Sequence, residues 1–232
     1  MRAPASERAR LVLRLGLAVL LMLASASLFG IVAEDVVSGN RITLLDVAIA
    51  RWLREWASPQ VTAWMLIVTH LHSTTAIAVY SAIAGAFMAR FRRWRSLATV
   101  VVCVGGGLAL NVLLKHAFQR TRPLLDDPLL TLQTYSFPSG HVVGSTLFYG
   151  LGVVLVFRRT PRLLWRLLAL SVAAAAIGLV AFTRLYLGVH YLSDVVAGFL
   201  EGVAWLALCL AALEAFWRRG GRWHDRDFVA PR

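Results

Sequence analysis

The sequence predicts an all-α membrane protein, a bundle of six transmembrane helices with one amphipathic helix at its outer surface. Of the 232 residues, 59% are hydrophobic, and the mean hydropathy is +0.68. This composition is too apolar for a soluble domain. The apolar residues also gather in runs of about 20, the helix length that crosses a hydrocarbon core of ~30 Å. Basic residues separate these runs, as in proteins whose chain crosses the membrane repeatedly.

Six apolar runs are long enough to be spans, and we expect them to form one membrane-embedded domain over residues 1–232. A short, charged cytoplasmic tail is expected at residues 218–232. The expected spans are residues 11–33, 73–90, 96–118, 141–157, 163–183 and 191–217.

Arginine clusters predict the orientation of the bundle. They precede the first span, follow the second and the fourth, and end the chain. By the positive-inside rule these segments are cytoplasmic, so both termini are expected inside and residues 34–72, 119–140 and 184–190 outside. The net charge is +12, but basic residues divided among loops do not form the continuous patch that binds nucleic acid. We therefore expect no nucleic-acid partner.

The outer segment after the first span is expected to contain an amphipathic helix on the membrane interface, which either caps the bundle or guides lipid. Its apolar positions at helical spacing are Leu45, Ala48, Ile49, Trp52, Leu53 and Trp56. Its polar positions are Asp46, Arg51, Arg54 and Glu55. The next apolar stretch, residues 60–91, is too long for one upright helix, so we expect a break near residues 70–73. His70 and His72 are interpreted as polar residues of this break rather than as metal ligands.

The first polar cluster of interest contains the only lysine of the chain. Lys115 ends the third span, and six residues separate it from Arg122 and Pro123. A helix that continued to Pro123 would place Lys115 and Arg122 on one face, where two cations meet one anion. Lysine supplies a compact charge, and the arginine fork binds two phosphate oxygens. Taken alone, the pair could also be interfacial cations that reach toward water.

The second cluster, Pro138-Ser139-Gly140-His141, stands directly before the fourth span. Ser139 is expected to cap this helix, whose first-turn amides point outward and attract an anion through their N–H groups and the helix dipole. Gly140 allows an anion to approach closely, and His141 has a proton to give. An ordinary helix start is the alternative.

The third cluster joins the last two spans. His190 and Asp194 are four residues apart, which lets the carboxylate accept one ring N–H and orient the other ring nitrogen. Gly188 allows a turn through which Arg184 can end the fifth span and point back to the site. A structural histidine and aspartate pair is the alternative. All three clusters are expected on the same outer side, and their roles are complementary, so we interpret them as one phosphate site.

The three clusters resemble the signature motifs of the type-2 phosphatidic acid phosphatase superfamily, and the six spans resemble its integral-membrane branch. Thr183 stands where that family usually has serine, and it is left out of the expected site. The resemblance implies a metal-independent lipid phosphatase without a cofactor, insensitive to EDTA and inhibited by vanadate. His190 would attack phosphorus, Asp194 would hold its tautomer, and His141 would protonate the leaving oxygen. The phosphate would be bound by Lys115, Arg122, Ser139, Gly140 and Arg184.

The resemblance also implies a substrate whose phosphate reaches the outer leaflet of a bacterial inner membrane. Undecaprenyl pyrophosphate is the first expectation, and phosphatidylglycerophosphate, phosphatidic acid and lipid A are alternatives. Two further classes are a vanadium haloperoxidase-like enzyme, against which the six spans argue, and a non-catalytic lipid-phosphate transporter, which would not need the histidine pair. The sequence leaves open the lipid, the number of phosphates, the oligomeric state and the access route of the lipid.

Three other polar residues have two interpretations each. Arg120 either contacts a second phosphate or headgroup or is solvated at the interface. Glu201 lies on the face of Asp194 but deeper, where it either packs with polar groups inside the bundle or relays protons. His116 adjoins Lys115 but points away from it, so we expect an interfacial role.

Overall fold

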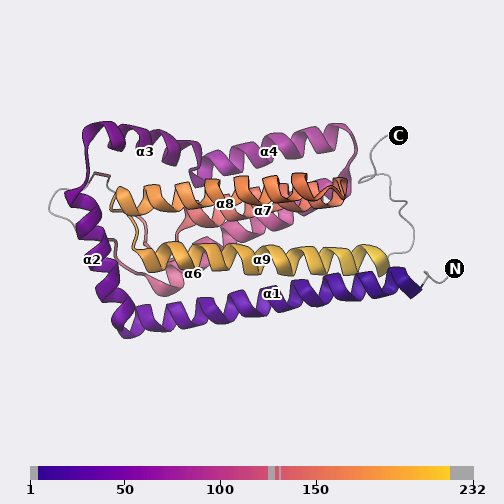
Figure 1. Cartoon of the computed structure of the whole chain (residues 1–232), viewed down its shortest axis with the longest axis horizontal. Coiled ribbons are helices and arrows are strands. Elements are labelled where there is room, and N and C mark those ends of the chain that lie inside the picture. Colours follow the sequence, from indigo (N-terminus) through magenta and orange to yellow (C-terminus); the bar gives the residue numbers. More distant parts are fainter. Residues whose placement is uncertain (1–4, 125–128, 131, 220–232) are drawn as a thin grey trace.

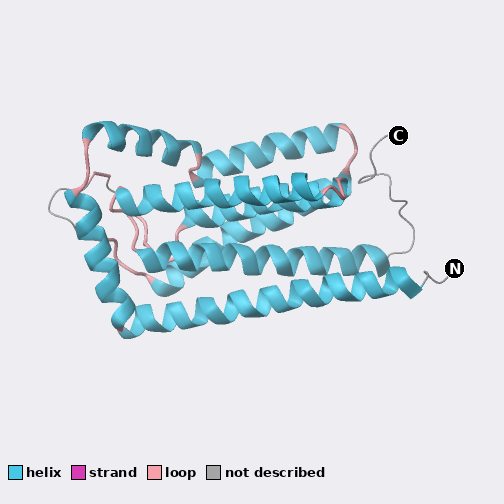
Figure 2. Ribbon diagram, in the orientation of Figure 1, coloured by secondary structure: helices cyan, strands magenta, loops and turns pink. Residues whose placement is uncertain are grey.

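The structure, a computed structural model, describes residues 5–124, 129–130 and 132–219. The described chain consists of helices and connecting loops (Figure 2), which confirms the predicted all-α class. Residues 126, 127 and 220–232, which include two loop aspartates and most of the expected tail, lie outside the described part. The helices are α1 (Ala5–Ser38), α2 (Arg41–Glu55), α3 (Pro59–Leu71), α4 (Thr74–Arg90), α5 (Trp94–Val100), η1 (Val101–Gly105), α6 (Gly106–Phe118), α7 (Gly140–Arg159), α8 (Leu163–Tyr186) and α9 (Leu192–Arg219).

Within the described residues, five stretches of helix are long and apolar enough to cross a membrane. They are α1 from Leu11 onward, the continuous α5-η1-α6 stretch, α7, α8 and α9 up to Trp217. The helices α3 and α4 together form a sixth candidate, bent by 41°. The expected break lies where it was predicted, between Leu71 and Thr74, but the span also includes α3 and is longer than residues 73–90. Both halves have serine caps, because Ser58 accepts from Val61 N at 3.4 Å and Ser73 from Ala76 N at 3.1 Å.

The long helices lie side by side, and α2 crosses one end of the bundle (Figure 1). Helix α1 packs along α9, and α7 packs against both α8 and α9. The core between the helices includes Ile77, Cys103, Val143 and Leu147, all at most 1% exposed. Large apolar side chains such as Leu20, which is 64% exposed, cover the outside. Apolar side chains on the outer surface suit a bundle surrounded by lipid.

Helix α2 differs from its sequence expectation in the direction of its polar residues. It packs against α1, α8 and α9 and buries Asp46, Ala50 and Leu53. Asp46, expected on the polar outer side, is only 1% exposed, whereas Trp52 and Trp56 are 57% and 71% exposed. The helix therefore presents tryptophans outward, as interfacial helices do, and directs a carboxylate into the protein.

A close approach between α9 and the start of α7 shapes the same end of the bundle. A Cβ atom at Gly198 would lie 2.7 Å from the carbonyl oxygen of Ser139, so only glycine fits there. The backbone N–H of Ser139 donates to the carbonyl of Asp194 at 3.0 Å. These contacts hold the second and third polar clusters against each other.

Candidate active site

The three polar clusters predicted from the sequence meet at the end of the bundle that α2 crosses (Figure 1). Lys115 lies in the last turn of α6, His141 in the first turn of α7, and Arg184 in the last turn of α8. His190 directly precedes α9, and Asp194 is in its first turn. His141 and His190 both lie within electrostatic range of Lys115, Arg122 and Arg184. Segments far apart in sequence thus form one cationic site.

The first cluster reaches the site in a different way from the one predicted. Helix α6 ends at Phe118 because Gln119 adopts a left-handed conformation with φ +47°, and its N–H donates to the carbonyl of Lys115 at 2.9 Å. Arg122 is therefore on a loop and does not share a helix face with Lys115. Pro123 also disfavours helical geometry at the residue before it. The side chain of Ser136 holds this loop by donating to the carbonyl of Thr121 at 2.9 Å.

Arg122 is held by the loop that follows it and reaches the third cluster. Its Nε donates to the carbonyl of Thr134 at 2.7 Å, and its Nη2 donates to the Thr134 hydroxyl at 2.8 Å. Its Nη1 donates to the carbonyl of Val189 at 2.5 Å and lies 3.3 Å from Nε2 of His190. Burial lowers the pKa of Arg122 below its ordinary value, but a guanidinium keeps its charge at neutral pH.

Lys115 is anchored to the same loop. Its Nζ donates to the carbonyls of Tyr135 at 2.6 Å and Ser136 at 3.3 Å. An ammonium has three N–H donors, so these two bonds leave one donor for another acceptor. The neighbouring His116 is exposed and packs edge-on against Tyr135 at 5.7 Å, in line with its expected interfacial role.

Ser139 occupies the N-cap position of α7, as predicted, but its side chain makes no capping hydrogen bond. Its hydroxyl is buried and has no partner among the described residues. Gly140 is packed so closely that an added Cβ would lie 2.9 Å from Oδ1 of Asn111. The hydroxyl of Ser139 is thus available to a ligand rather than used by the helix.

Arg184 is almost completely buried, with 1% exposure. Its Nη1 donates to the hydroxyl of Thr69 at 2.5 Å, while Nε and Nη2 have no partner among the described residues. The predicted turn at Gly188 is confirmed by its φ of +67° and by its N–H, which donates to the carbonyl of Leu185 at 3.0 Å. Buried cationic donors without an acceptor are costly, so this arrangement suits the binding of an anion.

His190 and Asp194 form a buried pair. Nδ1 of His190 lies 3.3 Å from Oδ2 of Asp194, which also accepts from the backbone N–H of Tyr191 at 2.9 Å. Arginine has donors only, so the contact with Arg122 favours a lone pair on Nε2 and the proton on Nδ1. Burial, followed by the charges of Arg184, Arg122 and Lys115, lowers the pKa of His190 well below its ordinary value. Burial therefore favours the neutral imidazole.

Arg120 is bound to two carboxylates and is not a solvated interfacial residue. Its Nη1 donates to Oδ1 of Asp194 at 2.6 Å and to the hydroxyl of Ser193 at 2.7 Å. Its Nη2 donates to Oδ2 of Asp46 at 2.8 Å, and the guanidinium lies 4.4 Å from the ring centre of Tyr191. Arg120 therefore holds Asp194 in place.

Sequence reasoning did not assign functional roles to Asp46, Thr69, Ser193 and Asn111. Asn111 donates to Oε2 of Glu201 at 2.9 Å, which confirms the expected polar packing of that carboxylate inside the bundle. The sequence did contain one signal for such residues: a polar side chain within an apolar helix needs a polar partner inside the bundle. The identity of the partners required the tertiary structure.

Three polar residues considered in the sequence analysis make hydrogen bonds away from the candidate site. The Thr183 hydroxyl donates to the carbonyl of Val180 at 2.7 Å, so it is used within α8. Nδ1 of His70 lies 2.6 Å from the carbonyl of Leu66 at the end of α3. His72 also lies at the helix break, and its Nε2 is 2.7 Å from the Tyr149 hydroxyl. Both histidines therefore make polar contacts around the break, as expected.

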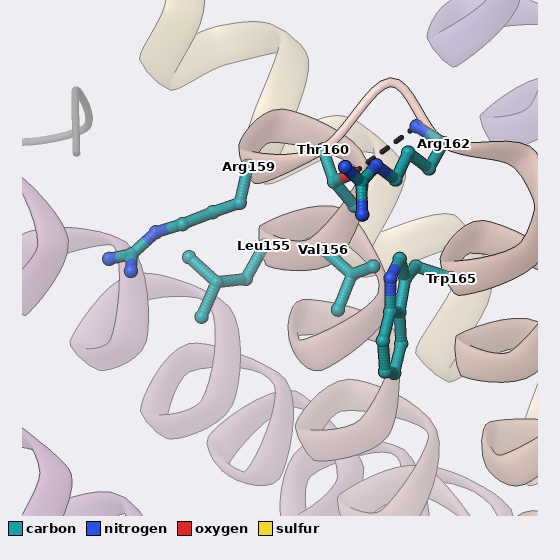
Figure 3. A pocket seen from close by; sticks show the side chains of 6 residues that line it. All are labelled: Leu155, Val156, Arg159, Thr160, Arg162 and Trp165. Carbon is teal, nitrogen blue, oxygen red and sulfur yellow. Dashed lines mark hydrogen bonds between the residues drawn. The ribbon is translucent and has the colours of Figure 1, made fainter. Parts of the chain in front are cut away.

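A hollow of about 410 Å³ lies at the other end of α7 and α8 (Figure 3) and is separate from this site. It carries two arginines but none of the three clusters. Its lining residues are Leu155, Val156, Arg159, Thr160, Arg162 and Trp165.

Known proteins with similar sequences include membrane phosphatases, in agreement with a phosphate site formed by the three clusters. The sequence profile of the PAP2 superfamily matches residues 96–218. Phosphatidylglycerophosphatase B of Bacillus subtilis (strain 168) is 30% identical over 181 residues, which cover 77% of this chain and 88% of that protein. Undecaprenyl-diphosphatase of Sulfolobus acidocaldarius is 30% identical over 131 residues, which cover 54% of this chain and 59% of that protein. The segment matched by the PAP2 profile, residues 96–218, contains all three clusters.

The fold is also similar to a solved structure, the crystal structure of the first transmembrane PAP2 type phosphatidylglycerolphosphate phosphatase from Bacillus subtilis. The TM-score is 0.74 at 27% sequence identity, and the match covers 88% of this chain and 98% of that chain. The likeness thus extends beyond the profile-matched segment to most of the bundle.

Proposed function

This chain belongs to the PAP2 superfamily and is a membrane lipid phosphatase, and we propose that it works through a phosphohistidine at His190. One observation carries this proposal: Nε2 of a buried imidazole lies beside the Arg122 cation, while its Nδ1 faces Asp194. Burial also lowers the pKa of this ring, which favours its neutral form. A histidine that only bound phosphate electrostatically would need a positive charge. A neutral, oriented ring is the form that attacks phosphorus.

Phosphate binding is assigned to the donors around His190. Arg184 contributes its two partnerless buried groups, and Ser139 contributes its hydroxyl. Lys115 and Arg122 add positive charge, and the amide of Gly140 lies at the positive end of the α7 dipole. Phosphoryl transfer relies mainly on positioning and on charge stabilisation, which these cations and donors provide.

The reaction then proceeds in two steps. Nε2 of His190 forms a bond to phosphorus as the bond to the lipid oxygen breaks, and His141 donates a proton to that oxygen. The phosphate charge favours the protonated form of His141 that this step needs. In the second step, His141 takes a proton from water, the water oxygen attacks phosphorus, and the bond to His190 breaks to release inorganic phosphate. Asp194 stabilises the positive charge on the ring throughout.

The role of His141 predicts a dependence on the leaving group. His141→Ala should lower kcat/KM for a lipid phosphate by about 10²- to 10⁴-fold, because an alkoxide leaves poorly without a proton. This ratio includes only the steps up to departure of the leaving group, so the later role of His141 as a base does not affect it. For p-nitrophenyl phosphate the loss should be much smaller, since nitrophenolate leaves unprotonated. Steady-state kinetics on both substrates test this, with His116→Ala as the matched control. Equal losses on both substrates would contradict the general-acid role.

We also propose an orientation of the bundle in the membrane. The arginine-rich turns between α4 and α5 and between α7 and α8 lie at the end of the bundle away from α2 (Figure 1). By the positive-inside rule that end is cytoplasmic, which puts the site at the periplasmic or extracellular surface of a bacterial inner membrane. The substrate's phosphate would enter the site from the outer leaflet while its tail stays in lipid.

Two lipids are the leading substrate candidates. Phosphatidylglycerophosphate is the first, because the phosphatidylglycerophosphatase B relative aligns over 77% of this chain. Undecaprenyl pyrophosphate, which the sequence analysis placed first, is the second and is supported by the undecaprenyl-diphosphatase relative.

A substrate panel tests the proposed function. Purified protein in detergent micelles should release inorganic phosphate from phosphatidylglycerophosphate or undecaprenyl pyrophosphate faster than from glycerol 3-phosphate, which has no tail to remain in the micelle. Release should persist in EDTA, since the proposed site uses side-chain cations. Folded protein that releases phosphate from neither lipid, or only with added Mg²⁺, would contradict the proposal.

A further inference from the structure

Asp46 is a buried acidic residue that the mechanism above does not use. It lies in the middle of α2, the helix that crosses the end of the bundle, and its side chain is fully buried. The exposed tryptophans of this helix, Trp52 and Trp56, face outward. An isolated buried carboxylate is too costly to persist without partners, so the contacts of Asp46 indicate what it does.

The contacts of Asp46 lead to the start of α9 and to Arg120. Oδ1 accepts the backbone N–H of Ser193 at 2.9 Å, and this amide is one of the first-turn donors that a helix cannot satisfy itself. Oδ2 accepts both the Ser193 hydroxyl and Nη2 of Arg120. Asp46 thus caps α9 from another helix and binds the arginine that holds Asp194.

Arg120 connects the two carboxylates. One of its Nη groups bonds Asp46 at 2.8 Å, and the other bonds Oδ1 of Asp194 at 2.6 Å. Because Oδ1 is held in this way, Oδ2 of Asp194 remains directed at Nδ1 of His190. The orientation of the proposed nucleophile therefore depends, through Arg120, on a residue of the interfacial helix.

The charges of Asp46, Arg120 and Asp194 indicate that Asp46 has more than a structural role. Two carboxylates around one guanidinium leave the Asp46, Arg120 and Asp194 cluster with one net negative charge. When His190 bonds to phosphorus its ring becomes positive, and the cluster then neutralises it. Without the charge of Asp46, the cluster would be neutral at rest and would compensate less of the ring charge. Electrostatic groups arranged before the reaction stabilise a transition state in this manner.

We infer that Asp46 is a positioning residue for the reaction, acting through Arg120 and Asp194 on His190 and linking the membrane-interface helix α2 to the active site. This inference rests on the proposed phosphohistidine mechanism. Asp46 does not itself contact the phosphate. Its effect should therefore appear in the rate of His190 phosphorylation and leave substrate binding nearly unchanged.

The test is Asp46→Asn, which keeps the shape of the side chain and removes its charge. We expect kcat to fall about 10- to 100-fold, the range found for outer partners that orient a functional histidine, with KM nearly unchanged. Rapid-quench measurement of the consumption of ³²P-labelled lipid phosphate by excess enzyme reports the phosphorylation step whether or not phosphohistidine accumulates, and it separates two causes. A slower rate of consumption supports positioning. A wild-type rate of consumption beside a lowered kcat means that part of the protein is misfolded, and would contradict the inference.

Leu53→Ala is the matched control, because Leu53 is a buried residue of α2 without charge. It should lower the Tm without slowing phosphorylation of the folded fraction. Equal slowing in both variants would mean that α2 acts only by packing, and would overturn the role of the Asp46 charge. If Asp46→Asn does not fold, Arg120→Gln tests the link from its other end, and wild-type phosphorylation in that variant contradicts the inference.

Wild-type protein in the same experiment distinguishes the two proposals. A wild type that hydrolyses lipid phosphate without phosphohistidine contradicts the proposed mechanism and, with it, this inference. A wild type that consumes lipid phosphate no faster than Asp46→Asn contradicts the role of Asp46 alone.

Discussion

His190→Ala is expected to reduce kcat by about 10⁴-fold or more, because it removes the atom that bonds to phosphorus. The protein should remain folded, since Asp194 keeps the hydrogen bonds from Arg120 and from the backbone of Tyr191. Reactions with ³²P-labelled lipid phosphate, quenched in alkaline detergent to preserve a phosphoramidate bond, measure the effect directly. Wild-type protein should yield acid-labile, base-stable label, and the variant should yield none.

His116→Ala is the control for this experiment. It removes an exposed imidazole one residue from Lys115, which packs edge-on against Tyr135. The control should keep its turnover and its label. Substantial turnover in His190→Ala, or label that persists there, would assign the attacking atom to another residue.

Asp194→Asn is expected to lower kcat by about 10³- to 10⁴-fold, as loss of the orienting carboxylate does in other histidine-dependent sites. Every contact of this carboxylate comes from a donor: Oδ1 faces Arg120, and Oδ2 faces the backbone of Tyr191 and Nδ1 of His190. Asparagine replaces one of these oxygens with an NH₂ group. In one orientation this NH₂ faces the N–H donor of Arg120, and in the other it faces the backbone N–H of Tyr191 and the Nδ1 side of His190. Turned toward His190, it favours the tautomer with its proton on Nε2, which removes the nucleophilic lone pair.

Nitrogen-15 NMR of histidine-labelled protein checks this cause independently of turnover. In wild-type protein His190 should be neutral at pH 7 with its proton on Nδ1, because burial and three nearby cations lower its pKa. The variant should show the opposite tautomer. Asp35→Asn is the control, because Asp35 accepts only an exposed hydrogen bond from Asn40, at 3.2 Å. Activity of Asp194→Asn within tenfold of wild type would contradict the orienting role.

The helices were largely predictable from local sequence. Runs of apolar residues locate the spans, because any helix in lipid must satisfy its own backbone and show an apolar surface. The break between Leu71 and Thr74 followed from the length of one apolar run. The end of α6 did not, since Gln119 is not a residue that marks a left-handed helix end as glycine does.

The candidate site was predictable in its members but not in its connections. Lys115, His141, Arg184 and His190 could be selected because their three clusters have complementary chemistry and were expected on the same outer side, although each cluster alone had an ordinary explanation. Arg122 was expected on a helix and lies on a loop, and Ser139 was expected to use its hydroxyl as a cap and does not. In both cases the local pattern identified the residue, while contacts from distant segments determined its geometry.

By itself the sequence determined that this chain is a helical membrane protein, and it predicted a candidate anion site, because hydropathy and the chemistry of short motifs are local properties. Only the tertiary structure decided that Asp46 faces inward and that Arg120 joins it to Asp194. Residues 46, 120 and 194 lie on separate segments, and the pattern along a helix shows which residues share a face but not which neighbour that face meets. The pairing of buried charges depends on that neighbour, so it required the packed bundle.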